Sequence, residues 1–77
     1  MVGGHNRKRT KIRIEFGQKV RQKRHDLDLS IEQLAEKADL HPNYIGSVER
    51  DKRNIALENI VALANALGCS SKDLMPL

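Results

Sequence analysis

The chain is poor in the residues that build disulfide-stapled, metal-bound or membrane-spanning proteins. It has one cysteine, Cys69, which cannot form an internal disulfide. That cysteine and three scattered histidines lack the paired spacing of a zinc site. The longest uncharged apolar run, residues 60–67, is far shorter than the roughly 20 residues that span a bilayer, and no signal-peptide stretch opens the chain. We therefore expect a cytoplasmic protein with no metal site and no membrane contact.

Sequence patterns of catalysis are missing as well. The chain has no glycine-rich phosphate loop, no nucleophile elbow and no pair of metal ligands, and 77 residues leave little room for a pocket. We expect His5 in a disordered segment, His25 at a helix end and His41 at a helix cap, where solvent, capping or a phosphate contact explains each. The sequence therefore predicts no enzymatic activity, no cofactor and no small-molecule ligand.

Positive charge is concentrated at one end of the chain. Residues 1–25 contain nine Lys and Arg against Glu15 alone, whereas residues 26–77 contain five Lys and Arg against nine Asp and Glu. The cations crowd together at Arg7, Lys8 and Arg9, which favours a polyanionic partner such as nucleic acid. A merely solvated tail is the alternative. We predict a flexible basic arm over residues 1–13 and one folded domain over residues 14–77.

The remainder of the chain shows helical periodicity and no strand-like alternation, which predicts an all-α fold. Ser30 and Gln33 form a capping box, Pro42 suits a first helical position, and Gly68 suits a helix C-cap. Gly17 inside the first helix costs stability unless a neighbour packs closely there. The five expected helices cover about residues 14–24, 31–38, 42–50, 57–67 and a last turn over 70–75.

Two of these helices, joined by a three-residue turn, are typical of a helix-turn-helix that reads DNA. At about 100° per residue, the third helix places Ile45 and Val48 on its buried side and Asn43, Ser47 and Arg50 on the opposite side, with Gly46 beside them. Asn can bond adenine bidentately, a small Ser admits close approach, and Arg can bond guanine or a phosphate. A solvated helix face is the alternative.

The segment from Asp26 to Gly68 resembles the helix-turn-helix family of phage repressors and Cro, and the likeness extends over about residues 14–75. Its V-E-R-x-x-R-N-I-x-L run, residues 48–57, looks most like the controller proteins of restriction-modification systems. The resemblance implies a five-helix domain that binds double-stranded DNA. It also implies DNA contacts at Asn43, Tyr44, Arg50, Arg53 and Asn54. For Tyr44, a position half in the core is the alternative.

The same resemblance suggests a structural ion pair. The helical projection places Glu49 near the buried side of the third helix, where a carboxylate needs a partner, and the family suggests Arg24.

Three departures from the family pattern limit what the resemblance implies for this chain. Asp39 stands where the turn usually has Gly, Ile31 where a Gln often contacts phosphate, and Pro42 where controller proteins often have Arg. The relatives' operator rules should therefore not be assumed.

The fourth helix is apolar over more of its circumference than a core stripe requires. In the family this region forms a two-fold interface, so we expect a homodimer with Ile60, Leu63, Leu67 and Leu74 at the interface, reading an inverted repeat. The alternative is a small helix wedged against its neighbours. We therefore expect a sequence-specific transcriptional regulator, with an antitoxin-type module that masks a protein partner as the alternative. The absence of a spare toxin-binding segment argues against the antitoxin.

Overall fold

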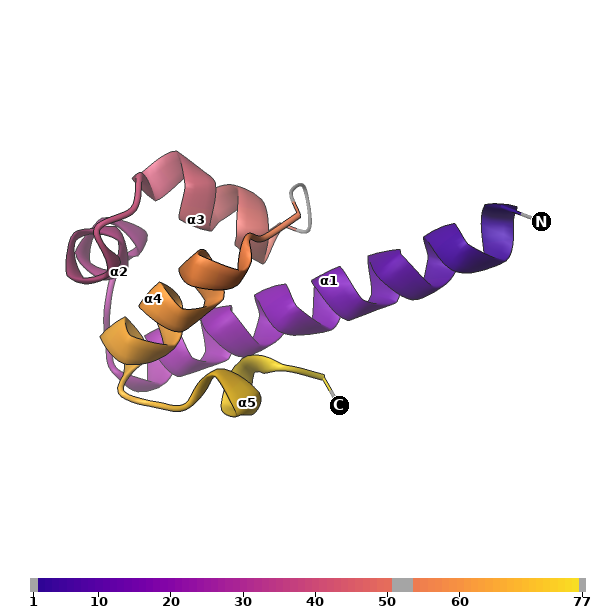
Figure 1. The fold of residues 1–77 in the computed structure, drawn as a ribbon. Coiled ribbons are helices and arrows are strands. Elements are labelled where there is room, and N and C mark those ends of the chain that lie inside the picture. Colours follow the sequence, from indigo (N-terminus) through magenta and orange to yellow (C-terminus); the bar gives the residue numbers. More distant parts are fainter. Residues whose placement is uncertain (1, 51–53, 77) are drawn as a thin grey trace.

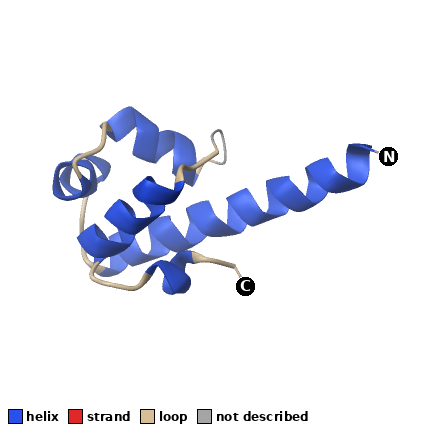
Figure 2. Ribbon diagram, in the orientation of Figure 1, coloured by secondary structure: helices blue, strands red, loops and turns tan. Residues whose placement is uncertain are grey.

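The computed structural model describes residues 2–50 and 54–76, with side chains described from Lys11 onward. Within those ranges the chain forms helices and no strand, as expected (Figures 1 and 2). None of the described helices is long and apolar enough to cross a membrane. The helices are α1 (Val2–Asp26), α2 (Ile31–Ala38), α3 (Pro42–Glu49), α4 (Leu57–Leu67) and α5 (Ser71–Leu74).

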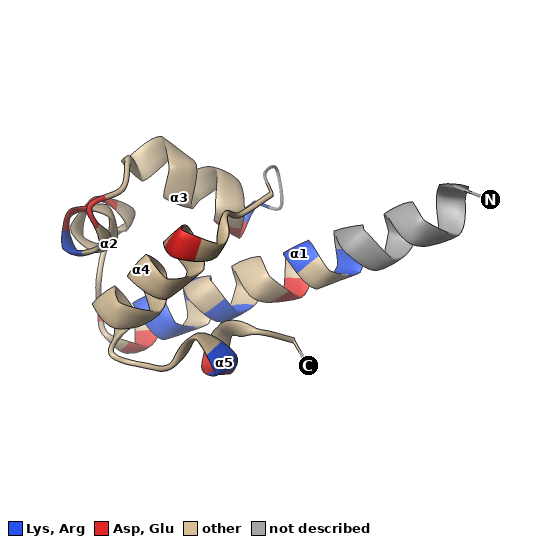
Figure 3. Ribbon diagram, in the orientation of Figure 1, with Lys and Arg blue, Asp and Glu red and all other residues tan. Residues whose placement is uncertain are grey.

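The first helix differs from the prediction. We expected it to begin near Ile14, but α1 begins at Val2, so residues 2–13 continue the helix where a flexible arm was predicted. Phe16 and Val20 pack this helix against the core. From there each residue added toward the N-terminus contributes one backbone hydrogen bond, and no proline in this stretch interrupts the helix. The 25 residues span about 37 Å, and the N-terminal end projects past the other helices (Figure 1). The described Lys and Arg are spread along α1 (Figure 3).

Local capping fixes where α2 and α3 begin and end. The Ser30 hydroxyl accepts from the Gln33 N–H at 3.0 Å, and Gln33 Oε1 accepts from the Ser30 N–H at 2.8 Å, which forms the expected capping box. Asp39 ends α2 in the left-handed region, with φ 57° and ψ 45°, a conformation that costs Asp less than most residues. His41 then caps α3, because its Nδ1 accepts from the Asn43 N–H at 3.0 Å.

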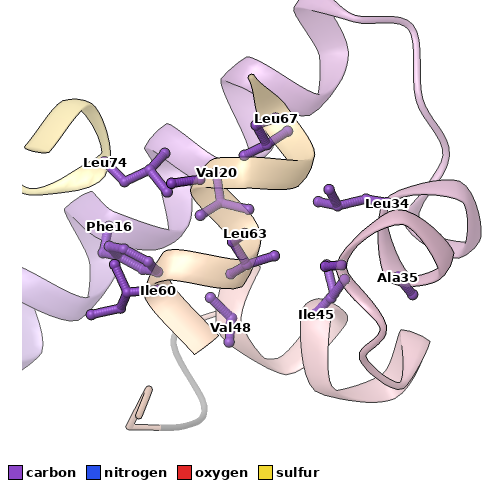
Figure 4. Close-up of a cluster of buried hydrophobic side chains, with 12 residues drawn as sticks. Phe16, Val20, Leu34, Ala35, Ile45, Val48, Ile60, Leu63, Leu67 and Leu74 are labelled. Atoms are coloured by element: carbon purple, nitrogen blue, oxygen red, sulfur yellow. The ribbon is translucent and has the colours of Figure 1, made fainter. Parts of the chain in front are cut away.

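The core lies where α1, α2, α3, α4 and α5 meet (Figure 4). Phe16 and Val20 of α1 and Leu34, Ile45 and Val48 of the helix-turn-helix are buried there. The core also contains Ile60, Leu63, Leu67 and Leu74, the four residues that we expected at a dimer interface. Leu63 and Leu74 are 0% exposed, Leu67 5% and Ile60 9%, so these side chains form the core of one chain and offer no surface to a second.

At Gly17 the backbones of α1 and α3 approach each other closely. A Cβ built on Gly17 would lie 2.5 Å from the Val48 carbonyl oxygen and 3.2 Å from the Glu49 Cα. Both neighbours are backbone atoms, so they cannot move aside by a change of rotamer. The sequence analysis expected a close neighbour to explain a glycine inside this helix, and the structure shows that neighbour.

We predict that Gly17→Ala destabilises the fold by about 1–3 kcal/mol, because the added methyl forces α1 away from α3. Ordinary helix propensity would give the opposite sign, since Ala is about 1 kcal/mol more favourable than Gly inside a helix. Urea unfolding monitored by circular dichroism measures the change. Gln18→Ala, at the adjacent exposed position, is the control and should be nearly neutral. A Gly17→Ala variant as stable as this control would contradict the close packing.

Candidate nucleic-acid interface

The outward face of α3 is polar and carries positive charge. Asn43 and Arg50 are exposed and Ser47 is half-buried, while Ile45 and Val48 are buried on the other side of the helix. The structure therefore brings the three residues onto one face, as the projection predicted. The acid of α3, Glu49, turns toward α1 and is occupied there by Arg24. Within Pro42–Glu49, this leaves the outward face without a carboxylate that would repel a polyanion.

Two of the three remaining predicted contacts, Tyr44 and Asn54, belong to the described residues. Tyr44 is half-buried and packs against the core, which fits the half-core alternative as well as an edge contact. Arg53 lies outside the described residues. Asn54 is exposed, and its Oδ1 accepts a hydrogen bond from Arg13 Nη1 at 2.8 Å. Arg13 and Asn54 are 41 positions apart, and no local pattern in the sequence indicates that they meet.

Arg7, Lys8 and Arg9 belong to the projecting part of α1. Their side chains lie outside the description, so the structure places only their backbone. Elsewhere in the described residues, cations follow α1 and acids gather on α2 (Figure 3). Glu32 and Glu36 are exposed acids of α2.

Arg24 and Glu49 form the ion pair that the sequence suggested. Arg24 Nε lies 2.8 Å from Glu49 Oε2 and Arg24 Nη2 lies 2.9 Å from Glu49 Oε1, so the contact is bidentate. The two side chains are only 10% and 6% exposed. Arg24 Nη1 also donates to the Leu29 carbonyl at 2.9 Å, which ties the turn before α2 to the pair. The hydrogen bond with Glu49 raises the pKa of Arg24, against an opposing effect of burial.

Two apolar side chains of α4 remain outside the core. Leu57 is 75% exposed and Val61 is 44% exposed, one helical turn apart. With Glu58 they line an open hollow on the surface. The apolar excess that the sequence showed on this helix is therefore real, but it falls on Leu57 and Val61 and not on the residues that we assigned to it.

We predict that Glu49→Ala lowers the free energy of unfolding by about 3–5 kcal/mol, because it leaves the Arg24 guanidinium buried without its partner. Chemical denaturation measures the loss. Glu36→Ala, which removes an exposed carboxylate from α2, is the matched control and should change stability by less than about 0.5 kcal/mol. Equal stability of the two variants would show that the pair does not hold the domain together.

Comparison with known proteins agrees with this geometry. The family model described as helix-turn-helix, HTH_3, matches residues 20–74. The chain is similar to the control protein C.BamHI of Bacillus amyloliquefaciens, with 49% identity over 65 residues that cover 83% of this chain and 80% of the relative. The crystal structure of the restriction-modification controller protein C.AhdI from Aeromonas hydrophila matches with TM-score 0.80 and 41% identity, covering 82% of this chain and 96% of that one.

A third match is the regulator of biofilm formation SinR in its crystal structure with DNA. Its TM-score is 0.74 at 30% identity, with 77% of this chain and 95% of that chain covered. The family model spans more than half of the chain, and two of the three proteins are control proteins of high identity. The chain belongs to the helix-turn-helix family of DNA-binding transcription regulators.

Proposed function

We propose that the protein binds an inverted-repeat operator as a homodimer, with α3 of each copy in the major groove, and thereby regulates transcription. The observation that carries this proposal is the outward face of α3. Asn43, Ser47 and Arg50 share that face, while Glu49 is withdrawn into an ion pair with Arg24. Such a face combines base-reading groups with positive charge and excludes negative charge from the groove.

Each side chain on the face has a chemistry that suits a base edge or a phosphate. The Asn43 amide can donate to and accept from adenine, and the Arg50 guanidinium can bond guanine bidentately. Ser47 is small enough to allow close approach of α3 to the groove floor. Pro42 and Ile31 lack the polar groups that the family often has at these positions, so the operator is expected to differ from those of the relatives.

The edges of the face supply contacts to the DNA backbone. Arg13 Nη1 donates to Asn54 Oδ1, so a contact with a phosphate oxygen would come from the Asn54 Nδ2 donor. We extend the proposal to Tyr44, which is half-buried, and to Arg53, which lies outside the described residues. The cations Arg7, Lys8 and Arg9 would add phosphate contacts from the projecting part of α1, which makes affinity salt-dependent without adding base specificity.

The homodimer is proposed to form through the exposed surface of α4. Leu57 and Val61 are the exposed apolar residues of this helix, and a two-fold axis beside them would bury each against the same residues of a second copy. The proposal requires this pairing to place the two α3 helices at half-sites about 34 Å apart. This surface replaces the interface predicted from Ile60, Leu63, Leu67 and Leu74, which the core occupies.

The biological setting follows from the relatives. C.BamHI is named a control protein and C.AhdI a restriction-modification controller, which supports the control of restriction-modification genes by this chain. SinR was crystallised with DNA, which supports the use of the shared fold on duplex DNA. A protein with this role acts on operator DNA in the bacterial cytoplasm.

Arg50→Ala tests the reading face. We predict that it weakens binding to the preferred duplex by about 1–3 kcal/mol, because a base or phosphate contact is lost. Fluorescence anisotropy at fixed salt measures the affinity, and binding to an unrelated duplex should change far less. Lys72→Ala, which removes an exposed cation from α5, is the control for net charge. Undiminished specific binding by a folded Arg50→Ala protein would show that α3 does not read DNA through this face.

Val61→Glu tests the dimer. We predict that it shifts the protein to monomer without unfolding it, because Val61 is 44% exposed and a buried pair of carboxylates would repel across the two-fold axis. Sedimentation velocity measures the oligomeric state, and circular dichroism monitors the fold. Leu27→Glu, at an apolar side chain that is 49% exposed in the turn after α1, is the control and should leave the dimer intact. A Val61→Glu protein that stays dimeric would exclude this interface.

A further inference from the structure

Gly46 is buried although it lies on the outward side of α3. It stands one turn before Arg50 and beside Asn43 and Ser47, so these four residues follow the i, i+3, i+4, i+7 spacing of a single helix face. A residue on the outward side of α3 would ordinarily be exposed, as Asn43 is. Some part of the protein other than the core must therefore cover Gly46.

The cover is the guanidinium of Arg50. A Cβ built on Gly46 would lie 3.0 Å from Arg50 Nη1, 3.7 Å from Cζ and 3.8 Å from Nη2, and these are its three nearest neighbours. The Arg50 N–H also bonds the Gly46 carbonyl at 3.1 Å, so backbone and side chain of Arg50 both fold back onto the same residue. The guanidinium thus lies against α3 and does not extend from its C-terminal end.

Gly46 differs from Gly17 in the kind of atoms that fill the space beside it. Around Gly17 the nearest atoms are backbone of another helix, so its missing side chain serves the packing of the fold. Around Gly46 the nearest atoms are the flexible end of one side chain on the predicted reading face. Glycine is less favourable than alanine inside a helix, and the three atoms that a Cβ at residue 46 would meet first all belong to the Arg50 side chain. The advantage of glycine here must lie outside stability.

We propose that Gly46 is a specificity-determining residue that positions the Arg50 guanidinium for DNA. The space left by the missing side chain seats the Arg50 guanidinium against Gly46, on the side of α3 that also carries Asn43 and Ser47. Bidentate contact with guanine depends on the plane and position of the guanidinium, so a seat formed before binding favours one base-pair preference. A methyl group at residue 46 would displace the guanidinium and leave the charge of the face unchanged. The proposal rests on the proposed function of α3.

A double-mutant cycle on the binding free energy tests this role. The four proteins are the unmodified chain, Gly46→Ala, Arg50→Ala and the double variant, and the probe is the inverted-repeat duplex that the unmodified protein selects from a randomised library. We expect Gly46→Ala to weaken specific binding about tenfold and to relax the preference at one base pair per half-site, as loss of a good contact would. In the Arg50→Ala background the same change should alter affinity less than about twofold.

Stability is measured on the same proteins by urea unfolding. Gly46→Ala should be as stable as the unmodified chain or more stable, which separates its effect on DNA binding from a folding defect. Gly46→Ser also adds a Cβ and serves as the second variant if Gly46→Ala aggregates. A control change at exposed Gln18 to Ala should alter neither affinity nor preference.

The outcomes separate this inference from the function on which it rests. Equal losses from Gly46→Ala with and without Arg50 would overturn the positioning role, because Gly46 would then act through its own approach to DNA. Unchanged affinity and preference in Gly46→Ala would overturn it too. If Arg50→Ala itself has no effect, or if the selection returns no motif, the proposed reading face fails and the positioning role fails with it.

Discussion

The junction between α1 and the C-terminal end of α3 is the constraint on which the remaining structure depends. Gly17 lets the two backbones approach until the Val48 carbonyl lies where a side chain would otherwise be. Two turns later on α1, Arg24 donates two hydrogen bonds of 2.8 and 2.9 Å to the Glu49 carboxylate. Arg24 also donates a hydrogen bond to the Leu29 carbonyl. A buried pair of this kind gives little net stability but makes alternative placements costly, because each would strand a charge. The long first helix therefore fixes the position of α3 along α1 and the rotation of α3 about its own axis.

That fixed rotation keeps the apolar residues of the eight-residue helix α3 on one side and its polar residues on the other. Ile45 and Val48 face the core, Glu49 faces Arg24, and the other side is left to small, amide and cationic groups. The turn before α3 contributes as well, since Asp39 adopts the left-handed region and His41 caps the helix through Nδ1. Binding through a rigid helix face requires little reordering on contact, which favours affinity for one arrangement of bases.

Most of the fold was predictable because its signals are local. The Ser30 capping box, Pro42 and Gly68 marked helix ends that the structure reproduces within a residue, and the rotation of α3 followed from the spacing of Ile45 and Val48. The predicted start of α1 was wrong, because helix propagation from a packed segment leaves no local mark on residues 2–13. Periodicity shows that the fourth helix is apolar on two sides but not which side the core takes, so it could not separate the buried Ile60, Leu63 and Leu67 from the exposed Leu57 and Val61. Two features could not be predicted from residue spacing. The hydrogen bond between Arg13 and Asn54 joins residues far apart in the sequence, and the contact of the Arg50 guanidinium with Gly46 depends on the rotamer of Arg50.

The most direct test of the central claim is selection of bound duplexes from a randomised library at about 150 mM salt, followed by sequencing and a salt titration of the preferred duplex. A dimer that reads DNA through two α3 helices predicts one motif with two-fold symmetry and half-sites one helical turn apart, whose affinity exceeds that of unrelated duplexes at every salt concentration. A bound pool without a motif, held only by salt-sensitive affinity, would contradict sequence reading by α3 and direct attention to a protein partner.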